Sequence, residues 1–517
     1  MNGARALIET LADCGVELCL ANPGTSEMHL VQALDQVPKM RSVLALFEGV
    51  CTGAADGYGR MTGKPAATLL HLGPGLANGI ANLHNARKAG TPIINLIGNH
   101  PQFHMGFDAP LTSDIDTLAR NFSCWIKSCS TAETLAQDGA EAFTATLRAT
   151  PGSQGQISTL ILGADAAWGD SPGTAKPNGI PRRALVDSQN VEQVARILES
   201  GETCVVIMEH DAIKTASLEQ AGKIAAKTGC RIMSGTFPAR VDGGAGTVNV
   251  ERMPYFPEHI LASFAGVQHL ILVGAQIPAS FFAYRTTPSR LVPEGCQVHT
   301  LARIEEDALD ALSQLVDRLG AGASVAKRFN KADVALPTGE MNTRNMIQAI
   351  AATLPENVIV ATDSGLGNAT HPACQTSAPH SWLSLTGGSI GQGSPVATGA
   401  ALACPDRRVL ALLGDGGAAY TIQSLWTQAR EQLNVTTVIF ANRKYNILNI
   451  EYGRLGVTEV GPIAASLFDI GNPDIDWAMM ANSFGVPSAT ARSAEELTAL
   501  LTRSYKQDGP FLIQAVC

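Results

Sequence analysis

Apolar and polar positions follow two different periods in the stretch from residue 408 to residue 445. A continuous apolar run at 409–413 predicts a buried strand, and a β-branched run at 435–440 predicts a second one. Between them lies a glycine-rich corner, followed by apolar residues spaced as on one face of a helix: Ile422, Leu425, Trp426 and Ala429. The pattern predicts a strand–helix–strand unit with polar residues at the carboxyl ends of its strands, where open α/β sheets bind ligands.

The same succession of strand, glycine junction and helix recurs along the chain. In the first segment we expect strands at 17–20, 43–47, 67–70 and 93–97, and helices at 3–14 and 78–87. In the middle segment we expect strands at 204–208, 231–233 and 270–273 and a helix at 217–228, and in the third a strand at 358–362. This alternation predicts an α/β fold of parallel sheets flanked by helices.

With 517 residues the chain is too long for one hydrophobic core, and three domains are the natural expectation. Stretches rich in proline and glycine lie at 168–180 and 320–339. We therefore predict domains at 1–167, 185–325 and 340–517.

Charge and cysteine content narrow the class of protein. Acidic residues exceed basic ones by 46 to 37, which argues against nucleic acid or an anionic membrane as a partner. The 11 cysteines are scattered without a C-x-x-C pair, so neither a disulfide framework nor a zinc site is indicated. Without a signal peptide or a long apolar span, we expect a soluble, cytoplasmic protein.

Two interpretations are considered for the ligand of the corner at residues 414–417: a dinucleotide, or a diphosphate bound through a metal ion. The spacing Gly414-x-Gly416-x-x-Ala419 matches a dinucleotide-binding fingerprint, but that site needs an acidic residue at the end of the second strand, where Asn442 stands. Asp415 would also repel a pyrophosphate. A divalent metal removes both objections, because Asp415 and Asn442 offer hard oxygen ligands and Mg²⁺ shares its shell with diphosphate oxygens. For Gly-Asp-Gly alone, a turn with a capping aspartate is about as good an interpretation.

These residues resemble the signature of the thiamine diphosphate (ThDP) enzymes, which is Gly-Asp-Gly, a helix and a strand, then Asn-Asn. Here Gly414-Asp415-Gly416 leads to Ala441-Asn442, and the Asn that is the family's metal ligand is kept. The resemblance covers essentially the whole chain and is closest to the acetolactate synthase and benzoylformate decarboxylase branch. It implies pyrimidine, central and diphosphate domains, with ThDP and Mg²⁺ between the subunits of a homodimer or homotetramer.

The resemblance also implies roles in the first segment. Phe47-Glu48-Gly49 is similar to the motif whose glutamate bonds N1′ of the aminopyrimidine, and we expect the Glu48 carboxylate to be desolvated. Without the resemblance, Glu48 would be interpreted as a helix-start acid. His71 falls where benzoylformate decarboxylase-like enzymes place a general acid/base. Thr25 matches their hydroxyl for the substrate carboxylate, Thr25 or Ser26 is the expected N-cap, and Asn78 is expected near the cofactor.

In the third segment the resemblance implies a cofactor-binding set. Ile390 matches the aliphatic wedge that bends the cofactor. The Lys444 carbonyl is expected to complete the metal shell beside Asp415 and Asn442. The expected contacts to the cofactor, mainly its diphosphate, are Ser364, Gly365, Gly416, Gly417, Tyr420 and Tyr445.

Five further residues are expected to line the substrate pocket: His100, His104, Ile447, Leu448 and Glu451. For the two histidines a surface-loop position is about as plausible. Pyruvate decarboxylases have a glutamate where Leu448 stands, and benzoylformate decarboxylase has an aromatic residue where Glu451 stands. We therefore expect small aliphatic 2-oxo acids as substrates rather than aromatic ones, with appreciable acyloin formation.

The implied activity is decarboxylation of a 2-oxo acid, followed by protonation to an aldehyde or ligation to a second carbonyl. Alternatives are a lyase acting on 2-hydroxy ketones or 2-hydroxyacyl thioesters, a ThDP-binding paralogue without turnover and, more distantly, a nicotinamide dehydrogenase. Relatives in the acetolactate synthase branch bind FAD in the middle domain. Here FAD is possible but not indicated, since no clear fingerprint is visible.

Overall fold

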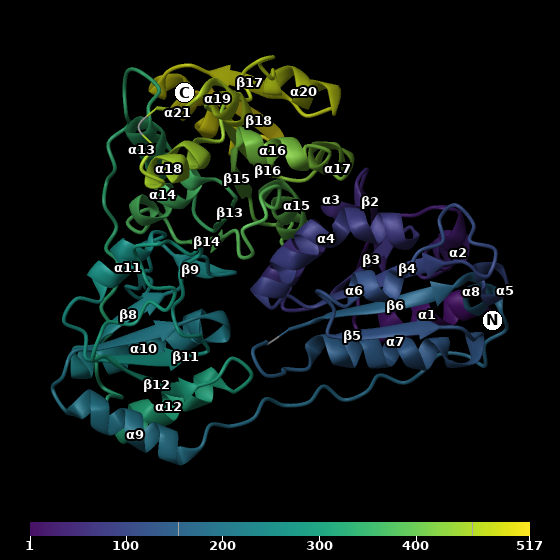
Figure 1. Ribbon diagram of the computed structural model, residues 1–517, viewed down its shortest axis with the longest axis horizontal. Helices are drawn as coiled ribbons and strands as arrows, with labels where there is room; N and C mark the ends of the chain where they lie inside the picture. Colours follow the sequence, from purple (N-terminus) through teal and green to yellow (C-terminus); the bar gives the residue numbers. More distant parts are fainter. Residues whose placement is uncertain (154, 458) are drawn as a thin grey trace. The chain divides into compact units, whose positions relative to one another are not determined.

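The structure is a computed structural model that describes residues 1–517 except Gln154 and Thr458 (Figure 1). The chain forms two compact units. Unit 1 comprises Met1–Leu147, Gln156–Gly179 and Ala332–Cys517, and unit 2 comprises Arg148–Gly155 and Ile180–Lys331. The division into three domains at 1–167, 185–325 and 340–517 stays a prediction.

The N-terminal part of unit 1 is a parallel sheet with strand order β2-β1-β3-β4-β6-β5. Its strands are β1 Leu18–Asn22, β2 Arg41–Leu44, β3 Ala66–Leu70, β4 Ile93–Asn99, β5 Trp125–Cys129 and β6 Ile157–Gly163. Its helices are α1 Gly3–Asp13, η1 Thr25–Glu27, α2 Met28–Gln36, α3 Glu48–Thr62, α4 Leu72–Ala89, α5 Gln102–Met105, α6 Ile115–Ala119, α7 Ala132–Leu147 and α8 Ala164–Trp168. One apolar core lies under α1 and α7, and another under α3 and α4 (Figure 1). Both faces of the sheet are therefore covered, as predicted.

The C-terminal part of unit 1 repeats this design, with its strands in the order β17-β18-β16-β15-β13-β14, all parallel. The strands are β13 Val358–Thr362, β14 His380–Leu383, β15 Val409–Gly414, β16 Val435–Ala441, β17 Ser488–Ala491 and β18 Phe511–Val516. The helices are α13 Thr343–Thr353, α14 Gly365–Cys374, α15 Gly393–Ala403, α16 Asp415–Tyr420, α17 Ser424–Arg430, α18 Asn446–Arg454, α19 Pro462–Phe468, α20 Trp477–Ser483 and α21 Ala494–Ser504.

The helix predicted from the apolar positions Ile422 to Ala429 corresponds to α17, which begins two residues later, at Ser424. A separate short helix, α16, precedes it, with a break at residues 421–423 between the two. Thr421 has a non-helical backbone, with φ −138°. Its hydroxyl donates a hydrogen bond to the Gly391 carbonyl (2.7 Å), and its own carbonyl accepts from the Ser424 amide (3.0 Å). The break thus comes from a contact with a residue 30 positions away, which helical periodicity does not report.

The two parts of unit 1 share a core where α3 crosses α15. Small residues bring the two backbones together: a β-carbon at Gly57 would lie 2.2 Å from the Val396 carbonyl oxygen, and one at Gly399 would lie 1.9 Å from that of Ala54. Real side chains do not approach so closely, so this crossing requires glycine at both positions.

A buried ion pair lies beside this crossing. The Arg60 guanidinium donates to Asp56 in the preceding turn of α3 (2.6 Å) and to the Ser384 carbonyl (2.7 Å), so one side chain ties the N-terminal part to the C-terminal part. Asp56 also accepts from the Thr91 hydroxyl (2.6 Å).

Unit 2 contains a parallel sheet with order β10-β8-β7-β11-β12. The strands of this sheet are β7 Cys204–Met208, β8 Arg231–Ser234, β10 Glu251–Arg252, β11 His269–Val273 and β12 Gln297–Ala302, and unit 2 also contains the short strand β9 Val241–Gly243. Its helices are α9 Ser188–Glu199, η2 His210–Ile213, α10 Thr215–Thr228, α11 Pro257–Ser263 and α12 Ala308–Arg318.

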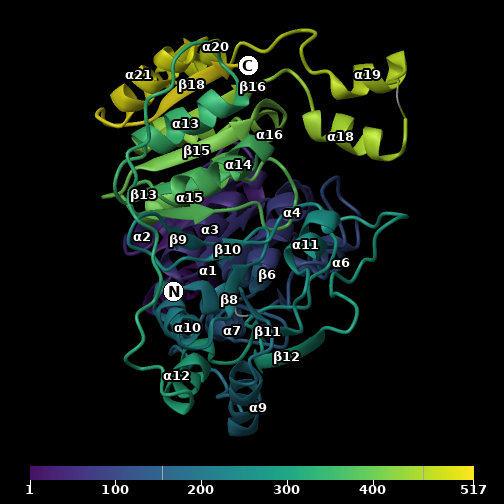
Figure 2. The ribbon, with the colours of Figure 1, turned by 90° about the vertical axis from the view of Figure 1, so that its left-hand side faces the viewer.

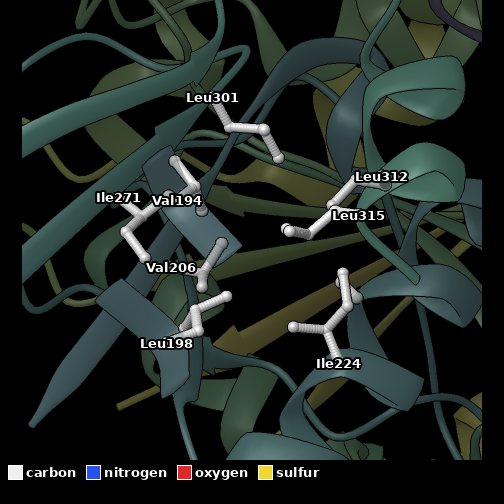
Figure 3. A pocket seen from close by; sticks show the side chains of 9 residues that line it. Val194, Leu198, Val206, Ile224, Ile271, Leu301, Leu312 and Leu315 are labelled. Atoms are coloured by element: carbon white, nitrogen blue, oxygen red, sulfur yellow. The ribbon is translucent and has the colours of Figure 1, made fainter. Parts of the chain in front are cut away.

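A cavity of about 10 Å³ lies between this sheet and its helices, enclosed by aliphatic side chains such as Val206, Ile224 and Leu312 (Figure 3). A space of this size can barely hold one water, and its walls offer no polar partner. It is therefore a dry packing defect and not a ligand site.

Within the part of the chain that the structure describes, no helix combines the length and the apolar character needed to cross a membrane.

The crossing of α3 and α15 yields a stability prediction. Gly399→Ala places a methyl group against the Ala54 carbonyl and should lower the free energy of unfolding by about 1–3 kcal/mol, the usual cost of overpacking. Gly106→Ala is the matched control, because a β-carbon there meets nothing within 4 Å. Urea unfolding followed by far-UV circular dichroism measures both. Equal midpoints for the two variants would contradict the proposed tight crossing.

Candidate active site

Glu48 is the first residue of α3, and its carboxylate accepts a hydrogen bond from the Asn78 side chain of α4 (3.0 Å). Glycine lets the helices approach here, since a β-carbon at Gly75 would lie 3.3 Å from the Glu48 Oε1 atom. The expected desolvation is not seen in the single chain, because Glu48 is only half-buried. Its position at a helix start also agrees with the simpler interpretation of a helix-start acid.

His71 directly follows β3, and its imidazole is hydrogen-bonded to Glu27. The Nδ1 atom of His71 lies 2.7 Å from the Glu27 Oε2 atom, and the Glu27 side chain is 0 % exposed whereas that of His71 is 25 % exposed. Glu27 also accepts from the Gly24 amide (2.7 Å) and the Ser26 hydroxyl (2.6 Å). Buried beside Gly98, this carboxylate orients the imidazole.

Sequence reasoning missed Glu27. The only signal was an acid in the polar turn that follows the first strand, and helix-start acids are common there.

The backbone directly after His71 is unusual. The next residue, Leu72, has φ 48°, a left-handed conformation that is rare for a bulky side chain.

Thr25 and Ser26 lie in η1, but only Ser26 faces the histidine. The Ser26 hydroxyl is 3.2 Å from His71 Nδ1, whereas Thr25 is exposed to solvent. The expected N-cap at Thr25 or Ser26 is wrong, because η1 is capped by Gly24 and α2 by Glu27. The Ser26 hydroxyl already donates its hydrogen to Glu27 (2.6 Å), so the role expected of Thr25 stays a prediction for Thr25.

His100 and His104 lie close to His71. Their rings form an edge-to-face pair with centroids 5.1 Å apart. Burial lowers the pKa of His100, and the charges of His104 and His71 lower it further. Its buried Nε2 atom has no hydrogen-bond partner among the described residues. The structure thus gathers three histidines and Glu27 at the carboxyl edge of the N-terminal sheet.

Asp415 and Asn442 follow the neighbouring strands β15 and β16, which pair in register up to Gly414 and Phe440. Asp415 accepts hydrogen bonds from the Gly416 amide (2.9 Å) and the Arg443 amide (2.6 Å). Burial raises the pKa of Asp415, and these amides oppose the shift. The carboxylate keeps lone pairs for a cation, so its surroundings fit a hard metal ion.

The other proposed metal ligands lie in the turn after β16. The Asn442 side-chain oxygen accepts from the Lys444 amide (3.2 Å), and the Lys444 carbonyl accepts from the Asn446 amide (3.0 Å). Each oxygen has a second lone pair, so all three expected ligands fit a metal at this edge of the sheet.

Aromatic side chains pack against the glycine corner. A β-carbon at Gly416 would lie 2.2 Å from the Tyr445 ring, and one at Gly391 would lie 2.6 Å from the Tyr420 β-carbon. Burial raises the pKa of Tyr445, and the neighbouring Tyr420 adds to the rise. Tyr420 itself is 54 % exposed.

Ser364 and Gly365 begin α14 beside this corner. The Ser364 hydroxyl accepts from the Gly367 amide (2.8 Å) and so serves as the N-cap of the helix. A β-carbon at Gly365 would meet nothing within 4 Å, which leaves open space for a bound group. Ile390 is half-buried in the turn that leads into α15.

Asp363 is a second buried carboxylate that sequence reasoning missed. It is 7 % exposed, and its Oδ2 atom accepts from the Gly391 amide (3.0 Å) and the Gly393 amide (3.1 Å). Burial raises the pKa of Asp363 to about 6, against the effect of these amides.

The helix α18 carries Ile447, Leu448 and Glu451. Ile447 and Leu448 are 45 % and 40 % exposed, and Glu451 lies 3.7 Å from Arg454. Figure 2 shows α18 beside α19, projecting from the C-terminal sheet. Ile447 and Leu448 are therefore open to solvent in the single chain.

The chemical groups therefore lie at two sheet edges. Among the described residues, no hydrogen bond or ion pair joins the edge of Glu48 and His71 to the edge of Asp415 and Asn442.

Comparison with known proteins identifies the family of the chain. The sequence family described as "Thiamine pyrophosphate enzyme, N-terminal TPP binding domain" matches residues 1–119, and its C-terminal TPP binding domain matches residues 363–515. A protein of Mycobacterium tuberculosis named "Putative acetolactate synthase large subunit IlvX" is 48 % identical over 100 % of this chain and 99 % of its own length. The chain belongs to the thiamine pyrophosphate (ThDP) enzyme family.

One further relative and one solved structure are similar to nearly the whole chain. Benzoylformate decarboxylase of Pseudomonas aeruginosa is 26 % identical, over 98 % of this chain and 97 % of that protein. The solved structure of the ThDP-dependent 4-hydroxybenzoylformate decarboxylase of Rhodococcus jostii RHA1 matches with a TM-score of 0.84 at 21 % identity, covering 99 % of this chain and 98 % of the other. The α/β fold and the resemblance to the acetolactate synthase and benzoylformate decarboxylase branch are confirmed.

The raised pKa of Asp363 predicts a pH dependence of stability in the protein without cofactor. An acid with a folded pKa near 6 and an unfolded value near 3.8 destabilises the fold as pH rises from 4 to 6, and then by a constant amount. From pH 4 to pH 7, wild type should lose up to about 3 kcal/mol relative to Asp363→Asn. Urea unfolding of both proteins at pH 4, 5, 6 and 7 gives this difference, and a pH-independent difference would contradict the assignment.

Proposed function

We propose that the protein is a ThDP- and Mg²⁺-dependent enzyme that acts at the carbonyl carbon of a 2-oxo acid. The product is released as an aldehyde after decarboxylation, or it is joined to a second carbonyl as an acyloin or acetolactate-type compound. The carrying observation is the pair of hard oxygen ligands, Asp415 and Asn442, at the ends of adjacent strands beside a glycine turn.

At the diphosphate end, Asp415, the Asn442 side chain and the Lys444 carbonyl would hold Mg²⁺. No group of three or more His, Cys, Asp or Glu side chains in the described part of the chain could bind a metal by itself. A shell shared with diphosphate oxygens is consistent with this limited set of ligands. Gly416, Gly417, Ser364, Gly365, Tyr420 and Tyr445 would line the bound diphosphate.

At the pyrimidine end, Glu48 would exchange a proton with N1′ of the aminopyrimidine. Asn78 fixes the carboxylate through its 3.0 Å hydrogen bond, and Ile390 would support the bent conformation. Bound ThDP supplies an electron sink for the bond that is cleaved at the substrate carbonyl.

His71 would move protons to and from the substrate. Glu27 accepts the hydrogen bond at Nδ1, which leaves Nε2 as the nitrogen available for proton transfer. Thr25, whose side chain is exposed in the same turn, would donate its hydroxyl to a substrate carboxylate, since the Ser26 hydroxyl is bonded to Glu27. His100 and His104 would line the same side of the pocket.

The active unit would be a homodimer, with a homotetramer suggested by the resemblance. The two edges are not joined within one chain, and exposed apolar side chains lie near each of them. Phe103 and Phe107 are 70 % and 76 % exposed beside His104, and Ile463 and Leu467 of α19 are 78 % and 69 % exposed. Burial of such groups against a second copy would be favourable.

Small aliphatic 2-oxo acids remain the expected substrates. Ile447 and Leu448 of α18 would form an aliphatic wall once a second chain covers them, with Glu451 at its edge. FAD and a cytoplasmic location stay expectations from the sequence.

Replacing Asp415 by Ala should abolish Mg²⁺-dependent retention of ThDP, because no other carboxylate lies in the turn. Asp406→Ala removes an exposed carboxylate just before β15 and is the control. Calorimetric titration with ThDP, with and without Mg²⁺, measures the effect. Unchanged affinity in Asp415→Ala would refute the metal assignment.

Replacing Glu48 by Gln should keep ThDP binding measurable but slow hydrogen–deuterium exchange at C2 of the bound cofactor severely. The amide can keep the hydrogen bond yet cannot exchange a proton with N1′. Glu133→Gln, which changes a helix-start acid of α7, is the matched control. If both variants exchange at the wild-type rate, Glu48 has no part in proton transfer.

Assays with a panel of 2-oxo acids test the reaction class. We expect more CO₂ release from pyruvate than from benzoylformate, with acyloin among the products. Preferred conversion of benzoylformate to free benzaldehyde would overturn the aliphatic pocket.

His71→Ala should lower turnover roughly 10²–10⁴-fold with less effect on cofactor binding, as expected for a general acid/base. A loss of turnover below tenfold would return His71 to a structural role.

A further inference from the structure

Asp363 lies where three segments of the diphosphate half meet. It follows β13 directly. Its Oδ2 atom accepts hydrogen bonds from the amides of Gly391, which follows Ile390, and of Gly393, the first residue of α15. A β-carbon at Gly417, in the glycine corner, would lie 3.1 Å from both of its oxygens. One buried carboxylate therefore contacts both the turn that carries Ile390 and the turn that carries Asp415.

The glycines around Asp363 leave no room for side chains. Gly391 has φ +93°, which side chains rarely adopt, and a β-carbon at Gly393 would lie 3.1 Å from the Asp363 Cγ atom. Gly393 and Gly417 therefore let the backbone approach the Asp363 carboxylate closely from two separate parts of the chain.

The free oxygen shows that this carboxylate is not fully used by the fold. Oδ1 of Asp363 is buried and has no hydrogen-bond partner among the described residues. A buried acceptor without a partner costs about 1–3 kcal/mol, and an Asn or Gln could make the two amide contacts without a buried charge. The two amide contacts therefore need an acceptor oxygen at this position and not a charge.

We propose that Asp363 is a positioning residue that clamps the Ile390 turn to the glycine corner, so that the two ends of the cofactor site keep a fixed spacing. This inference rests on the proposed ThDP site. It adds a residue to which no role has been given: Ile390 can support the cofactor only if its turn stays in place, and Asp363 supplies two of the hydrogen bonds that hold it.

A second contact holds the same turn from the opposite side. The Thr421 hydroxyl donates to the Gly391 carbonyl (2.7 Å), and Thr421 directly follows α16. Both peptide groups of Gly391 are thus bonded, its amide to Asp363 and its carbonyl to Thr421. The turn is held by the two segments that flank the diphosphate site and not by its own sequence.

The direct test is amide hydrogen exchange of the peptide that covers residues 388–393, measured by mass spectrometry on the protein without cofactor. Asp363→Ala should speed exchange of this peptide at least tenfold, because the Gly391 and Gly393 amides lose their acceptor. Asp363→Asn, which keeps an acceptor oxygen, should stay within about threefold of wild type. If Asp363→Ala does not fold, Asp363→Ser is read in its place, since its oxygen is too short to reach these amides.

The functional arm uses C2 hydrogen–deuterium exchange of bound ThDP at saturating cofactor. Asp363→Ala should slow it roughly 10–100-fold while Asp363→Asn restores it to within about threefold, a recovery that a general loss of stability would not show. Wild-type protection of the 388–393 peptide in Asp363→Ala, or equal losses in the Asn and Ala variants, would overturn the clamp. Failure of the wild type to bind ThDP would instead sink the proposed function and leave the amide result standing.

Discussion

The arrangement of unit 1 depends on the close crossing of α3 and α15. Gly57 and Gly399 allow the two helices to meet backbone to backbone. Each helix begins beside one half-site, which is the part of the candidate site on one sheet edge. Glu48 is the first residue of α3, and the Ile390 turn leads directly into α15. A side chain at the crossing would push the helices apart and would move both half-sites with them. The crossing is therefore a geometric constraint on chemistry that takes place at the helix ends.

The ion pair of Asp56 and Arg60 makes this crossing specific. A buried ion pair adds little net stability, since desolvation offsets the attraction, but breaking one by removing a partner costs about 3–5 kcal/mol. Arg60 also bonds the Ser384 carbonyl and the Thr386 hydroxyl, two residues of the other part of unit 1. Only one register of the two parts satisfies all these donors, so a slipped packing would leave a charge buried without its partners.

Much of the fold was predictable because parallel strands buried on both faces read as continuous apolar runs. The runs at 204–208 and 358–362 coincide with β7 and β13. The short helix α16 and the break after it were not predictable, because Thr421 is held by a hydrogen bond to Gly391 from a distant part of the chain. The same holds for the side chains of the candidate site. The motif located Glu48 and Asp415, but the burial of Glu27 and Asp363 depends on how Gly98 and Gly417 pack against them. In the sequence both acids look like ordinary turn or helix-start residues, and the roles of all these residues stay predictions.

The same arrangement occurs at both sheet edges. A buried carboxylate packs against a glycine and is hydrogen-bonded to the side chain or turn that faces the candidate site. Glu27 lies against Gly98 and holds His71, and Asp363 lies against Gly417 and holds the turn of Ile390. Such supporting contacts are what keep a reactive group in one orientation, because an exposed imidazole or a glycine-rich turn has many conformations of similar energy. The glycines are part of this arrangement, since a β-carbon would lie 1.7 Å from Glu27 at Gly98 and 3.1 Å from the Asp363 oxygens at Gly417. The geometry of the candidate site therefore depends on glycines as well as on side chains, which explains why strand–glycine junctions are an informative signal in this sequence.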